Sequence, residues 1–68
     1  MNKHKYVRFA PIRGFTITVG IVVKKDLINS HVQFPNGVRY QMRRWDTEWI
    51  TENEYKREVI KLTLKGEL

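Results

Sequence analysis

Apolar residues alternate with mostly polar ones over residues 15–24, and this pattern limits the fold of the chain more than any other feature. Residues two apart lie on the same face of a β-strand, so the pattern predicts one long strand with a buried face. Gly20 stands in its middle, where glycine often marks a bulge or a bend, and we expect the strand to bend there. The residues expected to face inward are Phe15, Ile17, Val19, Ile21 and Val23.

Two further alternating segments lie on either side of a turn at residues 35–37. A two-residue turn would set Arg39 opposite Phe34, on the apolar face, which costs free energy. A three-residue turn sets Val38 opposite Phe34 and keeps the apolar residues together. Its last position, Gly37, would adopt the left-handed backbone that closes a type I turn. The pattern therefore favours a hairpin with a three-residue turn.

A shorter alternating segment over residues 5–10 predicts the first strand, with Val7 and Phe9 facing inward. Thr51 and Glu54 have the spacing of a capping box, which predicts that a helix begins at Glu52.

The segment after this cap can be interpreted in two ways. A helix from residue 52 to about residue 61 would place Tyr55, Val59 and Leu62 in one stripe. The alternation at residues 60–64 instead indicates a last strand over residues 57–65. We favour a single helical turn over residues 52–55, followed by this strand.

Composition excludes several classes of protein. The chain has 68 residues and no cysteine, so it has no disulfide framework, thiolate nucleophile or cysteine metal site. A chain of this length is expected to form one domain. Its longest apolar run, residues 19–23, is too short to span a membrane, and no apolar segment typical of a signal peptide is present. We expect a soluble, cytoplasmic protein.

The basic residues are concentrated in the first two thirds of the chain. The net charge is +6, and nine of the thirteen Lys and Arg residues lie within residues 1–44, where Asp26 is the only acidic residue. A chain with this polarity is expected to present a basic face to an anionic partner.

The order of five short strands, a three-residue hairpin and a one-turn helix before the last strand resembles the Src-homology-3-like small β-barrel, the architecture of Tudor and KOW modules. Residues 20–23, 32–37 and 48–55 carry the resemblance. The last of these looks like the "W-[VI]-x-E-x-E-L" stretch of such barrels, with Tyr55 in place of Leu. The resemblance implies an all-β, five-stranded barrel over residues 1–68, with one helical turn before the last strand. The acidic loop and paired aromatics of its proline-peptide-binding members are missing.

The outward face of the predicted hairpin is the strongest functional feature. The preferred register sets Gln33 opposite Arg39 and His31 opposite Gln41. Arginine offers a planar fork of donors that suits phosphate, and glutamine can bond base edges. The same face could equally serve only to keep the hairpin solvated. The residues expected to bind a nucleic acid or another partner are Lys24, Lys25, His31, Gln33, Arg39, Gln41, Arg43, Arg44 and Trp45.

The two tryptophans are expected to have different roles. Trp49 is expected to be buried and to close one end of the barrel. Trp45 is expected to be partly exposed, where it can stack on a base or anchor a partner.

The two histidines, His4 and His31, are far apart in the sequence and have no local ligand partner, so we expect no metal site. Ser30 and His31 are neighbours on a strand and face opposite ways, so they form no catalytic dyad. We expect no enzymatic activity and no cofactor.

The sequence leaves three hypotheses for function. The first is a non-enzymatic module that binds DNA or RNA and acts as a regulator. The second is an accessory protein encoded by a phage or mobile element, which binds and modulates an acidic host protein. The third is a structural protein that self-associates through its strand edges. None of the three involves a membrane.

Overall fold

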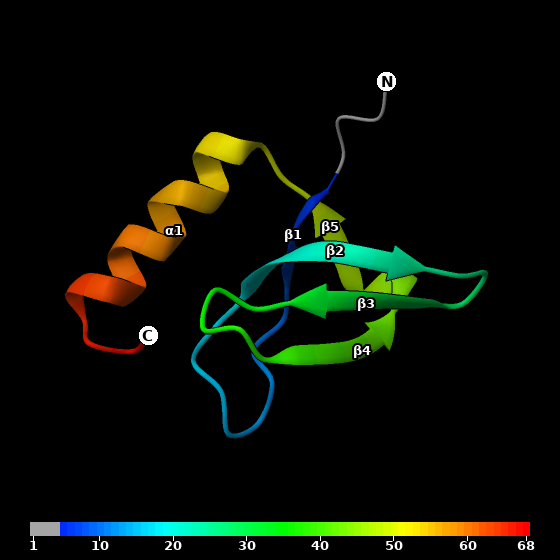
Figure 1. Ribbon diagram of the computed structural model, residues 1–68, viewed down its shortest axis with the longest axis horizontal. Coiled ribbons are helices and arrows are strands. Elements are labelled where there is room, and N and C mark those ends of the chain that lie inside the picture. The colour runs from blue at the N-terminus through cyan, green and yellow to red at the C-terminus, as the bar shows by residue number, and fades with distance from the viewer. Residues whose placement is uncertain (1–4) are drawn as a thin grey trace.

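Five antiparallel strands form one open sheet, and a C-terminal helix follows them, in the computed structural model of the chain, which describes residues 5–68 (Figure 1). The order of strands in the sheet is β4-β3-β2-β1-β5. The elements are β1 (Tyr6–Phe9), β2 (Val19–Lys25), β3 (Asn29–Gln33), β4 (Arg39–Arg43), a 3-10 helix (Arg44–Asp46), β5 (Thr47–Trp49) and α1 (Glu52–Leu64).

The register of the β3–β4 hairpin confirms the three-residue turn. Phe34 donates its backbone N–H to the carbonyl of Val38 at 2.8 Å, and Gln33 lies opposite Arg39. Gly37 has a φ of +92°, the left-handed conformation expected at the end of this turn. The Asn36 side chain accepts a hydrogen bond from Val38 N at 3.1 Å, which stabilises the turn further.

The inward face of the second strand differs from the prediction. β2 begins only at Val19, and it pairs Gly20 with Val7 and Val22 with Val32. Paired residues share a face, so Gly20 and Val22 lie on the inner face with Val7 and Val32. Val19 and Ile21 therefore lie on the outer face. The alternating pattern could not show which residues of β2 face inward, because the outer face of this strand is also covered, by α1.

The irregularity in β2 lies at Val23 rather than at Gly20. Val22 pairs with Val32 and Lys24 pairs with His31, so Val23 is an extra residue in the ladder. The bulge places Lys24 on the outer face and Lys25 on the inner face. Val23 itself is exposed, not inward as expected.

The chain is not all-β, because the expected last strand is a helix. The capping box is present, as predicted: Thr51 accepts from Glu54 N, and the Glu54 carboxylate accepts from Thr51 N. The helix continues to Leu64, so the predictions of a single helical turn over residues 52–55 and of a strand over residues 57–65 were both wrong. A one-turn helix and a last strand do occur, but earlier in the chain, as the 3-10 helix and β5.

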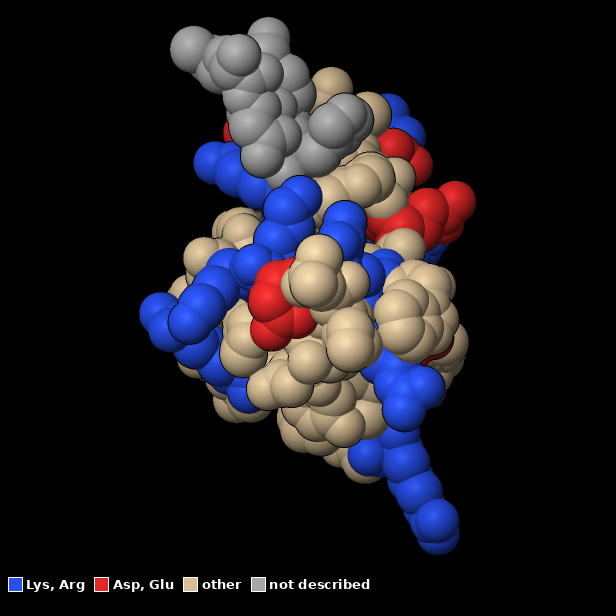
Figure 2. Space-filling model, turned by 90° about the vertical axis from the view of Figure 1, so that its right-hand side faces the viewer, with Lys and Arg blue, Asp and Glu red and all other residues tan. Residues whose placement is uncertain are grey.

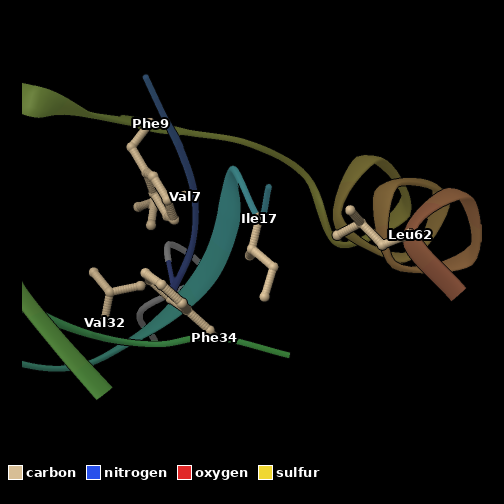
Figure 3. Close-up of a cluster of buried hydrophobic side chains, with 6 residues drawn as sticks. All are labelled: Val7, Phe9, Ile17, Val32, Phe34 and Leu62. Atoms are coloured by element: carbon tan, nitrogen blue, oxygen red, sulfur yellow. The ribbon is translucent and has the colours of Figure 1, made fainter. Parts of the chain in front are cut away.

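The buried side chains lie on both sides of β2 (Figure 3). Val7, Phe9, Val32 and Phe34 gather against the inner face of the sheet, whereas Ile17 points to the side of α1, where Leu62 is buried. The rings of Phe9 and Phe34 stack with centroids 5.3 Å apart. Val7 and Phe9 face inward, as predicted.

Helix α1 packs on the outer face mainly at β1 and β2, and in Figure 1 it lies to one side of the sheet, away from β4. Tyr55 packs on Tyr6, with ring centroids 4.8 Å apart. Burial beside Tyr6 raises the pKa of the Tyr55 hydroxyl. The outer face of β3 and β4 is left open by the helix, and this is the face on which the sequence places most of the predicted binding residues.

Candidate functional site

The open outer face carries an uninterrupted set of basic and polar side chains. The register aligns Lys24 with His31 and Gln41 in one row, and Gln33 with Arg39 in the next. Asn29 and Arg43 form a third row beside them. The paired positions of β2, β3 and β4 on this face include no acidic residue. Six predicted site residues thus share one face, which we call the outer basic face: Lys24, His31, Gln33, Arg39, Gln41 and Arg43.

The other three predicted residues, Lys25, Arg44 and Trp45, lie around a hollow at the end of the sheet. Lys25 pairs with Ser30 on the inner face, and Arg44 and Trp45 belong to the 3-10 helix that follows β4. The hollow measures about 320 Å³, and Leu27, Ser30, Thr47 and Trp49 complete its lining. We call it the tryptophan hollow.

Trp49 is not buried, contrary to the prediction. It pairs with Val7 at the end of β5 and faces inward, yet 42% of its surface is exposed. Trp49 lines the tryptophan hollow, and this opening leaves part of its side chain exposed. Lys25 places its Nζ 5.3 Å from the centre of the Trp49 ring, within the range of a cation–π contact. Trp45 is 65% exposed, which agrees with the prediction.

Arg43 lies between the outer basic face and Trp45 of the tryptophan hollow. Its Cα position is on the outer basic face, opposite Asn29, and its Cζ lies 5.7 Å from the centre of the Trp45 ring. A ligand that follows the outer basic face along β4 therefore reaches Trp45 at the end of the strand.

The β2–β3 turn beside the hollow is held by its own hydrogen bonds. The Asp26 carboxylate accepts from Asn29 N at 2.7 Å and from Ile28 N at 2.9 Å, and these bonds lower the pKa of the Asp26 side chain. The guanidinium of Arg44 lies 3.4 Å from the carbonyl oxygens of Asp26 and Leu27. Arg44 is thus directed at the turn, although it is exposed.

Basic side chains surround the end of the molecule that carries this turn (Figure 2). In this view they flank an uncharged surface with one acidic spot at its centre. On the helix side, three acidic residues form ion pairs. Glu48 bonds Arg8 at 2.7 Å, and within α1 Glu52 pairs with Lys56 and Glu58 with Lys61. The basic excess is therefore available on the outer basic face and at the hollow, not on α1.

A second hollow, of about 380 Å³, lies at the β4 edge. It is lined mainly by apolar side chains, among them Phe9, Ile12, Tyr40 and Met42. The ring of Tyr40 stacks on Phe34 at 5.9 Å, so this hollow is an extension of the aromatic core.

The residues 5–68 contain no cluster of three or more His, Cys, Asp or Glu side chains that could hold a metal ion. His4 lies outside the described residues. Within the same range, no helical segment combines the length and hydropathy needed to cross a membrane.

Sequence reasoning missed four members of the tryptophan hollow: Leu27, Ser30, Thr47 and Trp49. The signal that could have found Trp49 is the short alternation Thr47-Glu48-Trp49, which is a strand and sets Trp49 on the same face as Thr47.

No protein-family model matches the chain, and neither the curated proteins nor the solved structures include one that is detectably similar.

Proposed function

We propose that the chain is a non-enzymatic module that binds nucleic acid through its outer basic face. The observation that supports this most is the register of β2, β3 and β4, which gathers Lys24, Arg39 and Arg43 on one face without an acidic residue. Arginine and lysine neutralise phosphates, and release of counterions then drives binding. The amide groups of Gln33 and Gln41 add donors and acceptors between these charges.

The shape of the face also suits an extended polyanion. Paired residues on neighbouring strands lie about 5 Å apart, and successive rows on one face lie about 7 Å apart, so charges on β2, β3 and β4 span a surface rather than a point. Phosphate contacts position a protein on nucleic acid but do not read its sequence. We therefore expect binding that depends little on sequence and strongly on salt.

We further propose that the sheet is of the Src-homology-3-like type. The three-residue β3–β4 turn and the one-turn helix before β5 support this. In this proposal, α1 is an addition after the last strand.

The test is a salt titration of fluorescence anisotropy with labelled DNA and RNA probes, single-stranded and duplex. The wild-type protein should bind with micromolar affinity or better, and the affinity should fall as a power of salt concentration. The Lys24→Ala, Arg39→Ala double variant should bind roughly tenfold more weakly. The slope of log affinity against log salt concentration should become shallower by about one for each phosphate that the variant no longer neutralises.

The matched control removes the same charge from α1. In the Lys56→Ala, Lys61→Ala variant two lysines are removed, each of which pairs with a glutamate of the helix. This variant should retain wild-type affinity within about twofold, since surface ion pairs of this kind are worth little. Equal weakening of both variants would show that only net charge matters, and the outer basic face would then be rejected as the site.

An acidic protein remains the second candidate partner, because Trp45 and Leu27 are exposed beside the basic side chains. Apolar anchors next to charges are typical of protein interfaces. Failure of every nucleic-acid probe to bind at low salt would favour this candidate.

A further inference from the structure

The tryptophan hollow has the size and lining of a site for one planar ring. Its volume of about 320 Å³ lies at the lower end of the range for small-molecule sites, which is roughly 300–1,000 Å³. Two indole side chains, Trp45 and Trp49, contribute to its wall. Ser30, a buried polar residue, also lines it and places a hydroxyl there that can donate or accept a hydrogen bond.

Each indole in this hollow lies beside a cation. Lys25 Nζ is 5.3 Å from the Trp49 ring centre, and Arg43 Cζ is 5.7 Å from that of Trp45. Aromatic surface next to positive charge is the combination that binds single-stranded nucleic acid, because bases stack on the ring and phosphates contact the cation.

The wall of the hollow is fixed by hydrogen bonds to two backbone carbonyl groups. Arg44 N donates to the carbonyl of Ile28 at 2.8 Å, which ties the 3-10 helix to the β2–β3 turn. Thr47 Oγ1 donates to the carbonyl of Arg44 at 2.8 Å, which ties β5 to the same helix. The segments that carry Trp45 and Trp49 are therefore held in place before a ligand arrives, and this lowers the entropy cost of binding.

From these contacts we infer that the tryptophan hollow binds a nucleobase, and that the nucleic acid is single-stranded. The inference rests on the function proposed above and names the form of the nucleic acid. In a duplex each base is stacked and paired, so it cannot enter a hollow at the end of a protein sheet. In a single strand a base can splay out while its neighbours continue along the outer basic face. Arg43, between the two surfaces, would hold the phosphate at the point where the strand turns.

The experiment compares three twelve-unit probes: a single strand of thymidines, a DNA duplex, and a fully abasic strand with the same phosphates. Trp45 and Trp49 are the two tryptophans of the chain, so quenching of intrinsic fluorescence reports on this hollow. The thymidine strand should bind wild type tightest and quench its emission. The abasic strand should bind at least tenfold more weakly, since each stacked base contributes strongly to affinity.

The decisive variant is Trp45→Ala, which removes an exposed side chain and should leave the circular dichroism spectrum unchanged. It should bind the thymidine strand about tenfold more weakly or worse, and it should bind the abasic strand and the duplex as wild type does. Trp45→Phe keeps a stacking ring and should recover most of this affinity.

Three outcomes would contradict the base site, and they differ in whether the proposed function also fails. If Trp45→Ala binds all three probes as wild type does while the Lys24→Ala, Arg39→Ala variant weakens them, the proposed function stands and the base site is wrong. If wild type binds thymidine and abasic strands equally, no base is recognised and the base site is again wrong. If wild type binds none of the probes, both proposals fail.

Discussion

Gly20 stands at a position where even a methyl side chain would clash with the neighbouring strand. It is buried on the inner face of β2, and a Cβ atom built there would lie 2.3 Å from Val32 Cγ1 and 3.0 Å from the carbonyl oxygen of Gln33. Both neighbours belong to β3, and Val32 is fully buried with a stiff, β-branched side chain. The glycine is thus required for close approach of two strands rather than for an unusual φ.

We predict that Gly20→Ala lowers the free energy of unfolding by about 1–3 kcal/mol, the usual cost of overpacking a core. Chemical denaturation of the purified variant would measure this. Adding Val32→Ala removes the clashing methyl group, so the double variant should lose clearly less than the sum of the two single variants. Strict additivity would show that the contact with Val32 is not the cause.

The sequence correctly predicted which residues of β3 and β4 share a face, but it did not predict which residues of β2 face inward. The turn at residues 35–37 determines which residues of β3 and β4 share a face, and it can be derived from local chemistry alone. The faces of β2 could not be derived in this way, because the apolar residues on both its faces are covered, by the core on one side and by α1 on the other. Alternation identifies a buried face only when the other face meets water.

Among the elements, α1 shows how two apolar patterns can compete in one segment. Ile60, Leu62 and Leu64 alternate as in a strand, yet Ile60 and Leu64 are exposed. The stripe that packs on the sheet is the helical one, of Tyr55, Val59 and Leu62. The capping box at Thr51 marked the start of the helix correctly. The end of the helix is also marked locally, because Gly66 adopts a φ of +74° and Glu67 N donates to the carbonyl of Leu62 at 2.9 Å. The choice between helix and strand for the residues between these two ends depends on burial against the sheet, which no local pattern contains.

The carboxylate of Glu54 in this cap should make stability depend on pH. Its bonds from Thr51 N and Oγ1 lower its pKa, so the ionised form stabilises the fold. This contribution is complete above the unfolded-state pKa, about 4.3, and is lost as the pH falls through the lower folded-state pKa. The gap in thermal midpoint between wild type and Glu54→Gln should be constant from pH 7 to about 5.5, then close at lower pH. A gap that persists unchanged to about pH 2 would contradict this assignment of the pKa shift.

For the whole molecule, the packing of α1 on the sheet depends largely on Leu62. This side chain is 6% exposed and belongs to the same buried cluster as Ile17 and Phe34. A domain of this size has a small core, so one such contact is a large part of its total stability.

We predict that Leu62→Ala costs about 2–5 kcal/mol, enough to unfold a large fraction of the protein or to release the helix. Helix content by circular dichroism during urea titration would measure the loss. The same substitution two positions later is the control: Leu64 is 82% exposed, and Leu64→Ala should change stability by less than about 0.5 kcal/mol. Similar costs for the two variants would rule out the described packing of α1.

The candidate site was predictable only in the part that the neighbouring strands β2, β3 and β4 build. Six of the nine predicted residues share the outer basic face, because the β3–β4 register and the bulge in β2 place them there. The tryptophan hollow was not predicted, because it needs segments that are distant in sequence. The 3-10 helix carries Trp45, and β5 pairs Trp49 with Val7 of the first strand.

The bulge at Val23 also affects how this strand tolerates changes in length. The pairs on either side of it, Val22 with Val32 and Lys24 with His31, would be consecutive in a regular ladder if Val23 were absent. An in-frame deletion of its codon would therefore leave Lys24 and Lys25 on their present faces. In a strand without such an extra residue, the same deletion moves every later side chain to the opposite face. Loss of this codon from the gene would therefore shorten the protein by one residue and leave the charge pattern of both surfaces unchanged.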